Sequence, residues 1–360
     1  MRTHSRRAVP LALLALALAS AASPSCSRST PHVSIGASGS DSRAGAVEPT
    51  PGILSEEEWT FGGVQGSIVR TEHYRIFTTE KNPVIKSRMI TFVEYALAHY
   101  RTALAPLPAP PMRLDTYLMD NRPQWERVTQ RLAGEQANEL TRIQRGGFAF
   151  NGIGVYYDLG LFDTLAIAAH EGWHQYTQRT FKDPLPVWLE EGIAVWMEGH
   201  KWNGGVPVFA PWTNLERFDQ LRRAMSRDGF MPLSKLINSR PQDFLGEGDS
   251  LLLDYYAHLW ALVQFINTAE GGKYAPKLRE LLDDCVRGNQ RKTVASRVSE
   301  RAAVSALATR LGPAVFQAYF SADLDQAEVE FKQFVSRLIA PGARDAIVQG
   351  RAPAGVAGEK

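Results

Sequence analysis

The sequence has few cysteines and almost no net charge. Cys26 and Cys285 are its only two cysteines in 360 residues, too few for the disulfide framework of a small secreted domain. The 40 lysines and arginines nearly balance the 38 aspartates and glutamates, which leaves a formal net charge of +2. The excess of positive charge that proteins use to bind nucleic acid is therefore missing, and we expect no nucleic-acid partner.

Long hydrophobic runs and internal repeats are also missing. The apolar stretch from Ala8 to Ala19 is shorter than the roughly 20 residues that a membrane-spanning helix needs. It is preceded by a basic start and followed by small residues, a pattern typical of a signal peptide. The sequence therefore predicts that residues 1–25 are removed and that the protein is exported to a periplasmic or extracellular location.

Two cleavage sites compete after this stretch. Ala19-Ser20-Ala21 fits an ordinary small-x-small site, whereas Ser23-Pro24-Ser25-Cys26 resembles a degenerate lipobox that would place a membrane-tethering lipid on Cys26. Residues 26–60 begin with a Ser-, Gly- and Pro-rich stretch and are predicted to be a disordered tether. A disulfide between Cys26 and Cys285 is an alternative, but a lipid on Cys26 and a buried Cys285 are the simpler interpretation.

The periodicity of apolar residues changes along the rest of the chain. Strand-like alternation at 66–78, 113–119, 146–150 and 154–157 is interspersed with helical spacing at 84–104 and 121–132. After Gly199 the spacing is helical almost throughout. This order predicts an α+β fold with a helical C-terminal half, in one domain over residues 61–340. Residues 341–360, rich in Ala, Gly and Arg, are predicted to be a flexible tail.

The motif H-E-x-x-H lies on a predicted helix that Asp163 is expected to cap. His170 and His174 are four residues apart, so both imidazoles project from one helix face and can bind the same metal ion. Glu171 is rotated away from this pair, where it can reach a metal-bound water instead. Imidazole and carboxylate ligands in an exported hydrolase favour Zn²⁺. Gly172 is unusual inside a helix and suggests that a neighbouring element approaches closely.

A second helix is predicted to begin at Pro186, because proline is tolerated in the first helical turn. It contains two adjacent carboxylates, Glu190 and Glu191. Either of them could complete a His₂Glu ligand set that leaves a fourth position open for water. Helical phase does not choose between them, because each has apolar neighbours three or four residues away.

The two segments HEGWHQY (170–176) and P-x-W-L-x-E-G-x-A (186–194) together resemble the gluzincin clan of zinc metallopeptidases, especially the peptidase MA-like domains of exported bacterial proteins. In that pattern the Glu directly before Gly binds the metal. The resemblance therefore implies Glu191 as the third ligand and leaves Glu190 solvated or beside the ligands. It also implies a zincin-like fold, with a small mixed sheet, active-site helices and a helical C-terminal subdomain.

The segment beginning at Asp254 resembles a later helix of these proteins in which a tyrosine faces the site. The resemblance implies that Tyr256 stabilises the developing oxyanion. Two alternatives stay open, namely that Tyr256 is a core residue and that His258 takes this role. The histidine ligands should also donate their second ring N–H to a neighbouring group, for which Asp163 and Glu198 are candidates.

These residues predict a zinc-dependent hydrolase that cleaves peptide bonds with a zinc-bound water activated by Glu171. Its partner would be a peptide or protein substrate, which could pair with an edge strand near residues 148–157. A zinc hydrolase of a non-peptide amide or of cell-wall material is one alternative, and a catalytically silent binding lipoprotein is another. The histidines His73, His99 and His200 are expected to be structural or exposed, because none has a partner at ligand spacing.

Overall fold

The computed structural model describes residues 52–143, 145–244 and 249–356. The predicted signal peptide, Cys26 and most of the predicted tether lie outside these residues. Cys285 is buried, as expected. Among the described residues, no helix has the length and apolar character needed to cross a membrane.

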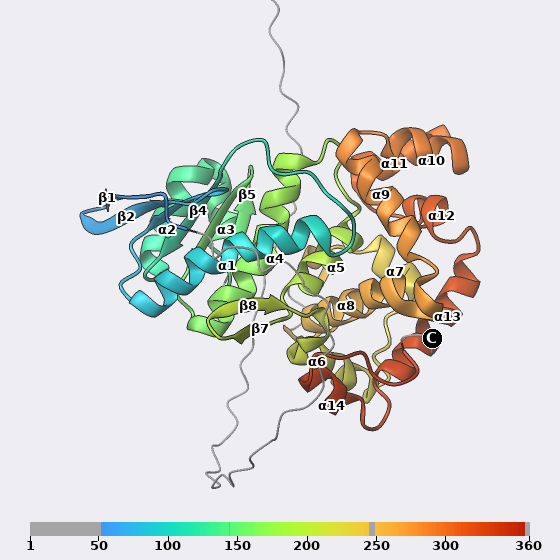
Figure 1. Ribbon diagram of the computed structural model, residues 1–360. Coiled ribbons are helices and arrows are strands. Elements are labelled where there is room, and N and C mark those ends of the chain that lie inside the picture. The colour runs from blue at the N-terminus through green and yellow to red at the C-terminus, as the bar shows by residue number, and fades with distance from the viewer. Residues whose placement is uncertain (1–51, 144, 245–248, 357–360) are drawn as a thin grey trace, which may run out of the picture.

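A six-stranded mixed sheet makes up one side of the molecule (Figure 1). Strands β3, β4 and β6 run parallel, whereas the pairs β1–β2, β2–β3 and β5–β6 are antiparallel. The short strand β5 has only β6 as a neighbour and therefore forms an edge of the sheet. In spatial order the strands are β1 (Ser55–Phe61), β2 (Val64–Arg70), β3 (Tyr74–Thr78), β4 (Leu114–Met119), β6 (Ile153–Tyr157) and β5 (Phe148–Phe150).

Helices cover both faces of the sheet. Because side chains alternate along a strand, Tyr156 packs into the main core with α1 (Pro83–Thr102) and α4 (Leu161–Thr180). Its neighbour Val155 faces a smaller cluster built around Trp125 of α2 (Arg122–Ala133). The short α3 (Ala137–Leu140) adds Leu140 to that cluster. The sheet is thus buried on two sides and holds α4 firmly in place.

The second half of the chain is helical, apart from the two-stranded sheet of β7 (His200–Asn203) and β8 (Val206–Phe209). The mixed α+β composition with a small sheet agrees with the sequence prediction. The β7–β8 hairpin was not predicted. The helices are α5 (Val187–Met197), α6 (Leu215–Met225), α7 (Leu233–Asn238), α8 (Asp249–Gly272), α9 (Ala275–Arg287), α10 (Gln290–Arg297), α11 (Glu300–Thr309), α12 (Ala314–Tyr319), α13 (Leu324–Leu338) and α14 (Ala343–Val348).

Both predicted domain ends need correction. Residues 55–60, placed in the disordered tether, form most of β1, which pairs with β2 across a turn at two glycines. Residues 343–348, placed in the flexible tail, form α14, whose Ile347 is fully buried. The run of three glutamates in β1 does not favour a strand, and the Ala-, Gly- and Arg-rich composition around α14 does not favour an ordered helix. In both segments tertiary contacts override this local preference.

Helix α5 lies in the centre of the molecule, between α4 and the C-terminal helices (Figure 1). All of its residues are buried, as expected for a helix that is apolar on every side. The same holds for α4 from Thr164 to Thr177. Any charged side chain on these two helices is therefore in the interior, where it needs a partner.

Gly172 allows α1 to pack closely against α4, as the sequence suggested. A Cβ atom at this position would lie 2.6 Å from the hydroxyl oxygen of Tyr100. That hydroxyl donates a hydrogen bond of 2.8 Å to the carbonyl of Ala169, one residue before the first histidine. The contact thus holds α4 in place next to its two motif histidines.

We expect Gly172→Ala to destabilise the protein by about 1–3 kcal/mol, because the added methyl group overpacks the contact with Tyr100. In the Tyr100→Phe background the same change should be neutral or stabilising by up to about 1 kcal/mol, because the clashing oxygen is gone and alanine is the better helix former. Urea unfolding of the four proteins measures both effects. An equal cost in the two backgrounds would show that Tyr100 is not the obstacle.

Candidate metal centre

Helix α4 brings the two histidines of the motif together. Their ring centroids lie 5.1 Å apart, and both side chains are buried. The expected cap is wrong: the helix begins at Leu161 after Gly160, with no side-chain capping bond. Asp163 lies in the first turn, where its carboxylate accepts a hydrogen bond of 2.9 Å from Arg145.

Glu191 of α5 completes a triangle of ligand atoms with the two histidines. Its Oε2 atom lies 3.7 Å from Nε2 of His170 and 3.7 Å from Nε2 of His174. All three ligand atoms lie within 4.8 Å of one another. Tetrahedral ligands that are each about 2.0–2.1 Å from a zinc ion are themselves separated by roughly 3.4 Å. This group could therefore hold a metal ion after only small adjustments.

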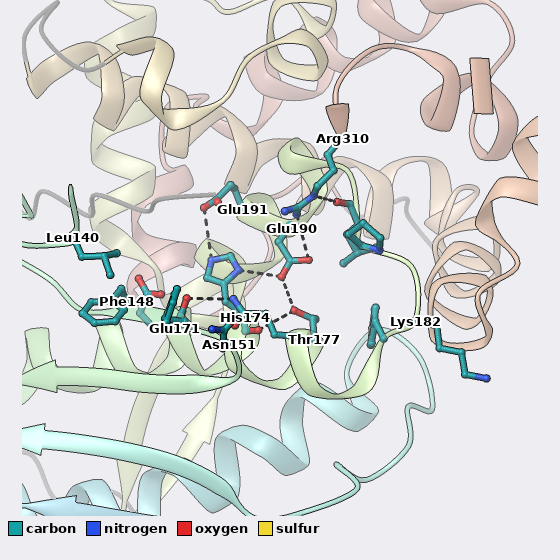
Figure 2. A pocket seen from close by; sticks show the side chains of 16 residues that line it. Leu140, Phe148, Asn151, Glu171, His174, Thr177, Lys182, Glu190, Glu191 and Arg310 are labelled. Atoms are coloured by element: carbon teal, nitrogen blue, oxygen red, sulfur yellow. Dashed lines mark hydrogen bonds and ion pairs between the residues drawn. The ribbon is translucent and has the colours of Figure 1, made fainter. Parts of the chain in front are cut away.

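The polar atoms of this triangle have no other partner among the residues that the structure describes. The Nε2 atoms of both histidines and Oε2 of Glu191 are buried without a hydrogen bond. Buried polar atoms are rarely left unsatisfied, and three of them converge here. A cation bound among them would satisfy all three at once, so the residues fit a metal ion. Figure 2 shows the side chains of His174 and Glu191 facing one another in the wall of a pocket.

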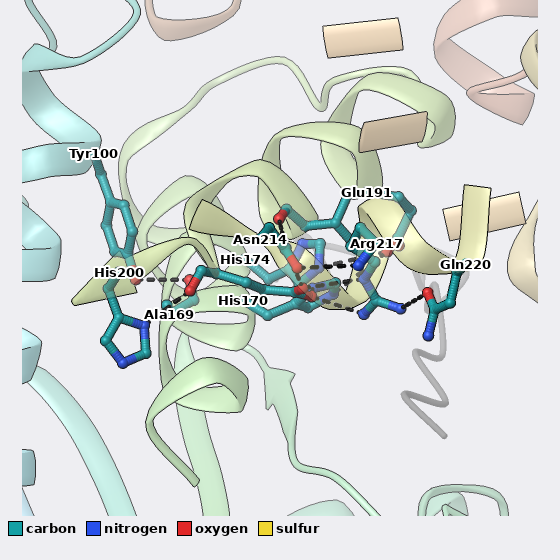
Figure 3. Close-up of polar contacts among 11 residues, drawn as sticks. Tyr100, Ala169, His170, His174, Glu191, His200, Asn214, Arg217 and Gln220 are labelled. Carbon is teal, nitrogen blue, oxygen red and sulfur yellow. Dashed lines mark hydrogen bonds and ion pairs between the residues drawn. The ribbon is translucent and has the colours of Figure 1, made fainter. Parts of the chain in front are cut away.

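A buried charge pair holds Nδ1 of His170, the ring nitrogen that is not part of the ligand triangle. Its Nδ1 atom lies 2.9 Å from Oε1 of Glu198, which directly follows α5. Arg217 of α6, which is also buried, donates hydrogen bonds to both oxygens of Glu198, and Asn214 donates another (Figure 3). Burial opposes ionisation, but Arg217 and His170 lower the pKa of Glu198 to about 2. Of the two candidates from the sequence, Glu198 is thus the partner of the histidine, and Asp163 is not.

The outer nitrogen of His174 has its own carboxylate. Its Nδ1 atom lies 3.0 Å from Oε1 of Glu190, which also accepts a hydrogen bond of 2.7 Å from Thr177. Glu190 is buried rather than solvated. The two adjacent glutamates of α5 therefore have separate tasks, because Glu191 faces the inner nitrogens and Glu190 fixes one imidazole from outside. The structure resolves the ambiguity that helical phase left open.

Glu171 is buried at the wall of the same pocket, and its carboxylate forms no hydrogen bond with another side chain among the described residues. Burial raises the pKa of Glu171 to about 8, and the carboxylate of Glu191 acts in the same direction. A metal dication among the three ligands would lower this pKa and stabilise the ionised form. An ionised carboxylate in this place is suited to accept a proton.

Tyr256 of α8 lies beside the His170 ring of the centre. Its ring stands edge-on to His170 with a centroid distance of 6.0 Å, and the guanidinium of Arg217 lies 5.4 Å from its centroid. The hydroxyl is buried without a partner, and burial raises its pKa. His258 is directed elsewhere, since it bonds the backbone of Met231 and Asp254. The tyrosine is therefore the better placed of the two to donate a hydrogen bond near the centre.

The three histidines that were expected to be structural lie outside the triangle. His73 pairs with Glu94 at 2.8 Å. His99 stacks on Trp196, and burial lowers its pKa to about 4. His200 is buried, and its Nδ1 atom lies 2.8 Å from the backbone oxygen of Glu198. None of them belongs to the metal-binding group.

A pocket of about 380 Å³ opens onto the centre, a size that is ordinary for a ligand site. Its walls are largely apolar and include β5 with the loop between α4 and α5. Glu171, His174 and Glu191 are part of its wall, and Arg310, which follows α11, lies beside Glu190 (Figure 2). The apolar lining includes Leu140, Phe148, Phe150, Phe181 and Leu185.

Two arginines of this region were missed by the sequence analysis. Arg217 and Arg310 lie 26 and 119 residues after Glu191 in the chain, and no motif links either of them to the histidines. Their positions beside Glu198 and Glu190 arise only from helix packing.

No family model, no curated protein and no solved structure matches this chain.

Proposed function

We propose that this protein is a zinc-dependent hydrolase with a zincin-like fold that cleaves peptide bonds. The observation that carries the proposal is the convergence of three unsatisfied buried ligand atoms, from His170, His174 and Glu191, on one point. Two imidazoles and one carboxylate form a ligand set that suits Zn²⁺ and leaves a coordination position open, as catalytic zinc sites do. The two flanking carboxylates fix the imidazoles in orientation.

When bound, Zn²⁺ would polarise a substrate carbonyl and lower the pKa of a coordinated water. Glu171 takes the proton of the attacking water and passes it to the leaving amine. The position of its buried carboxylate at the pocket wall supports this role. Tyr256, whose hydroxyl is unpaired, would donate a hydrogen bond to the oxyanion.

The shape of the pocket favours a peptide. Strand β5 lines it and pairs only with β6 among the described residues, so an extended chain that displaces the Gln178 side chain from the carbonyl of Ala149 can add to the sheet beside Glu171. Phe148 and Phe150 on this strand offer apolar contacts to alternate side chains. Export and a lipid on Cys26 remain predictions from the sequence, because these residues lie outside the described part of the chain.

Zinc content tests the proposal directly. Elemental analysis of the purified protein should give about one zinc per wild-type chain, and His174→Ala and Glu191→Gln should lose it or bind it far more weakly because each removes a ligand. Circular dichroism establishes that both variants are folded. A folded wild-type protein that stays free of zinc after zinc is supplied would rule out the zinc hydrolase.

A further inference from the structure

Arg310 joins the C-terminal helices to the rim of the pocket. It follows α11 with a left-handed backbone at φ 58°, a conformation that is uncommon for residues other than glycine. Its carbonyl accepts a hydrogen bond of 2.9 Å from the backbone N–H of Val187. Its Nε atom donates one of 2.7 Å to the carbonyl of Leu185. Both bonds hold the guanidinium at a defined place beside the loop that precedes α5.

The two arginines of the centre differ in how far they are satisfied. Arg217 faces Glu198, which contacts His170. Arg310 occupies the corresponding place on the other side, because it faces Glu190, which contacts His174. Every guanidinium nitrogen of Arg217 forms a hydrogen bond, and its side chain is fully buried. Arg310 is different, because within the described part of the chain its two terminal nitrogens form no hydrogen bond. The nearer one lies 4.0 Å from Oε2 of Glu190, and the side chain is 18% exposed.

Arg310 is one of the residues that line the pocket beside the candidate metal centre, and its guanidinium lies next to Glu190 (Figure 2). Lys182, the other basic residue at this pocket, is exposed and its side chain points away (Figure 2). A guanidinium with both terminal nitrogens available matches the two oxygens of a carboxylate. The binding group for an anion is therefore present in a pocket whose walls are otherwise mostly apolar.

We propose that Arg310 binds a carboxylate of the substrate, so that the protein prefers peptides with an acidic side chain or a free C-terminus near the cleaved bond. This inference rests on the proposed peptidase function. The guanidinium lies 4.0 Å from the carboxylate of Glu190, which lies 3.0 Å from the ring of His174, one of the three candidate ligands. Because an extended residue spans about 3.3–3.6 Å, the carboxylate belongs within about three residues of the bond that is cut.

A matched peptide library tests the preference. Acetylated octapeptides are prepared with Glu or Gln at each position, and with a free or an amidated C-terminus, so that the two sources of a carboxylate are separated. The zinc-loaded full chain should cut the acidic members about 10- to 100-fold faster than their neutral partners, the factor expected of a charge-assisted hydrogen bond. Mass spectrometry of the products gives the rates and the positions of the cuts.

Variants then assign the preference to Arg310. In Arg310→Gln the ratio of acidic to neutral rates should fall to about one, whereas Lys182→Gln, the matched control, should keep the wild-type ratio. Arg310→Lys retains the charge without the paired nitrogens and should give an intermediate ratio, which provides a second test if Arg310→Gln fails to fold. An arginine that only holds the loop in place would change the rates without changing this ratio.

A wild-type ratio near one, or an unchanged ratio in Arg310→Gln, would overturn the inference while the peptidase function stands. If the zinc-loaded protein cuts no peptide, the proposed function fails instead. In that case the binding of the same peptides to immobilised wild-type and Arg310→Gln protein is measured, and it decides whether Arg310 binds a carboxylate. Retention that favours acidic peptides and is lost in the variant supports the carboxylate site, and retention without such a difference contradicts it.

Discussion

Replacement of Glu171 by glutamine should reduce peptide hydrolysis by about 10²- to 10⁴-fold, the range expected when a general base is removed. Glutamine has nearly the same shape but cannot accept the proton. The fold should tolerate the change, because burial already disfavours the charged carboxylate at this position. Zinc content should also stay the same, since Glu171 is not one of the three ligand residues. The measurement is kcat/KM together with elemental analysis on the same preparation.

The control for this experiment is Glu58→Gln, which makes the same chemical change at an exposed position of β1. It should leave both activity and zinc content at the wild-type level. A Glu171→Gln protein that hydrolyses peptides at the wild-type rate would remove this residue from the mechanism. Loss of zinc together with loss of activity would instead point to a role in metal binding.

Replacement of Arg217 by methionine should cost about 3–5 kcal/mol of unfolding free energy, because it leaves the carboxylate of Glu198 charged and buried without its main partner. It should also weaken zinc binding by about 10- to 100-fold, because Glu198 then no longer holds the His170 ring firmly. Chemical denaturation of the metal-free protein measures the first effect, and competition with a zinc chelator measures the second.

Two further variants show where these effects come from. Arg217→Met combined with Glu198→Gln should recover much of the stability, since no uncompensated charge remains, but not the zinc affinity. Arg227→Met breaks an ion pair with Asp254 in which the arginine side chain is 51% exposed, and it should cost less than about 1 kcal/mol. A similarly small cost for Arg217→Met would show that Glu198 does not depend on this arginine.

The sequence predicted the helices of the centre well, because their signals are local. The spacing of His170 and His174 and the proline before α5 act within one or two helical turns. The same reasoning misjudged the ends of the domain. Strand β1 depends on pairing with β2 despite three consecutive glutamates, and α14 depends on burial of Ile347 against residues far away in the chain.

The sequence by itself thus determined which two imidazoles can share one metal ion, since four-residue spacing on a helix aligns them wherever that helix lies. Only the tertiary structure decided which glutamate of α5 faces the ligand triangle and which one supports a histidine, because that depends on how α5 crosses α4. It also decided that Arg217 compensates the buried carboxylate of Glu198. A buried charge is compensated by whichever side chain the packing brings within hydrogen-bonding distance, and separation along the chain places no limit on that choice.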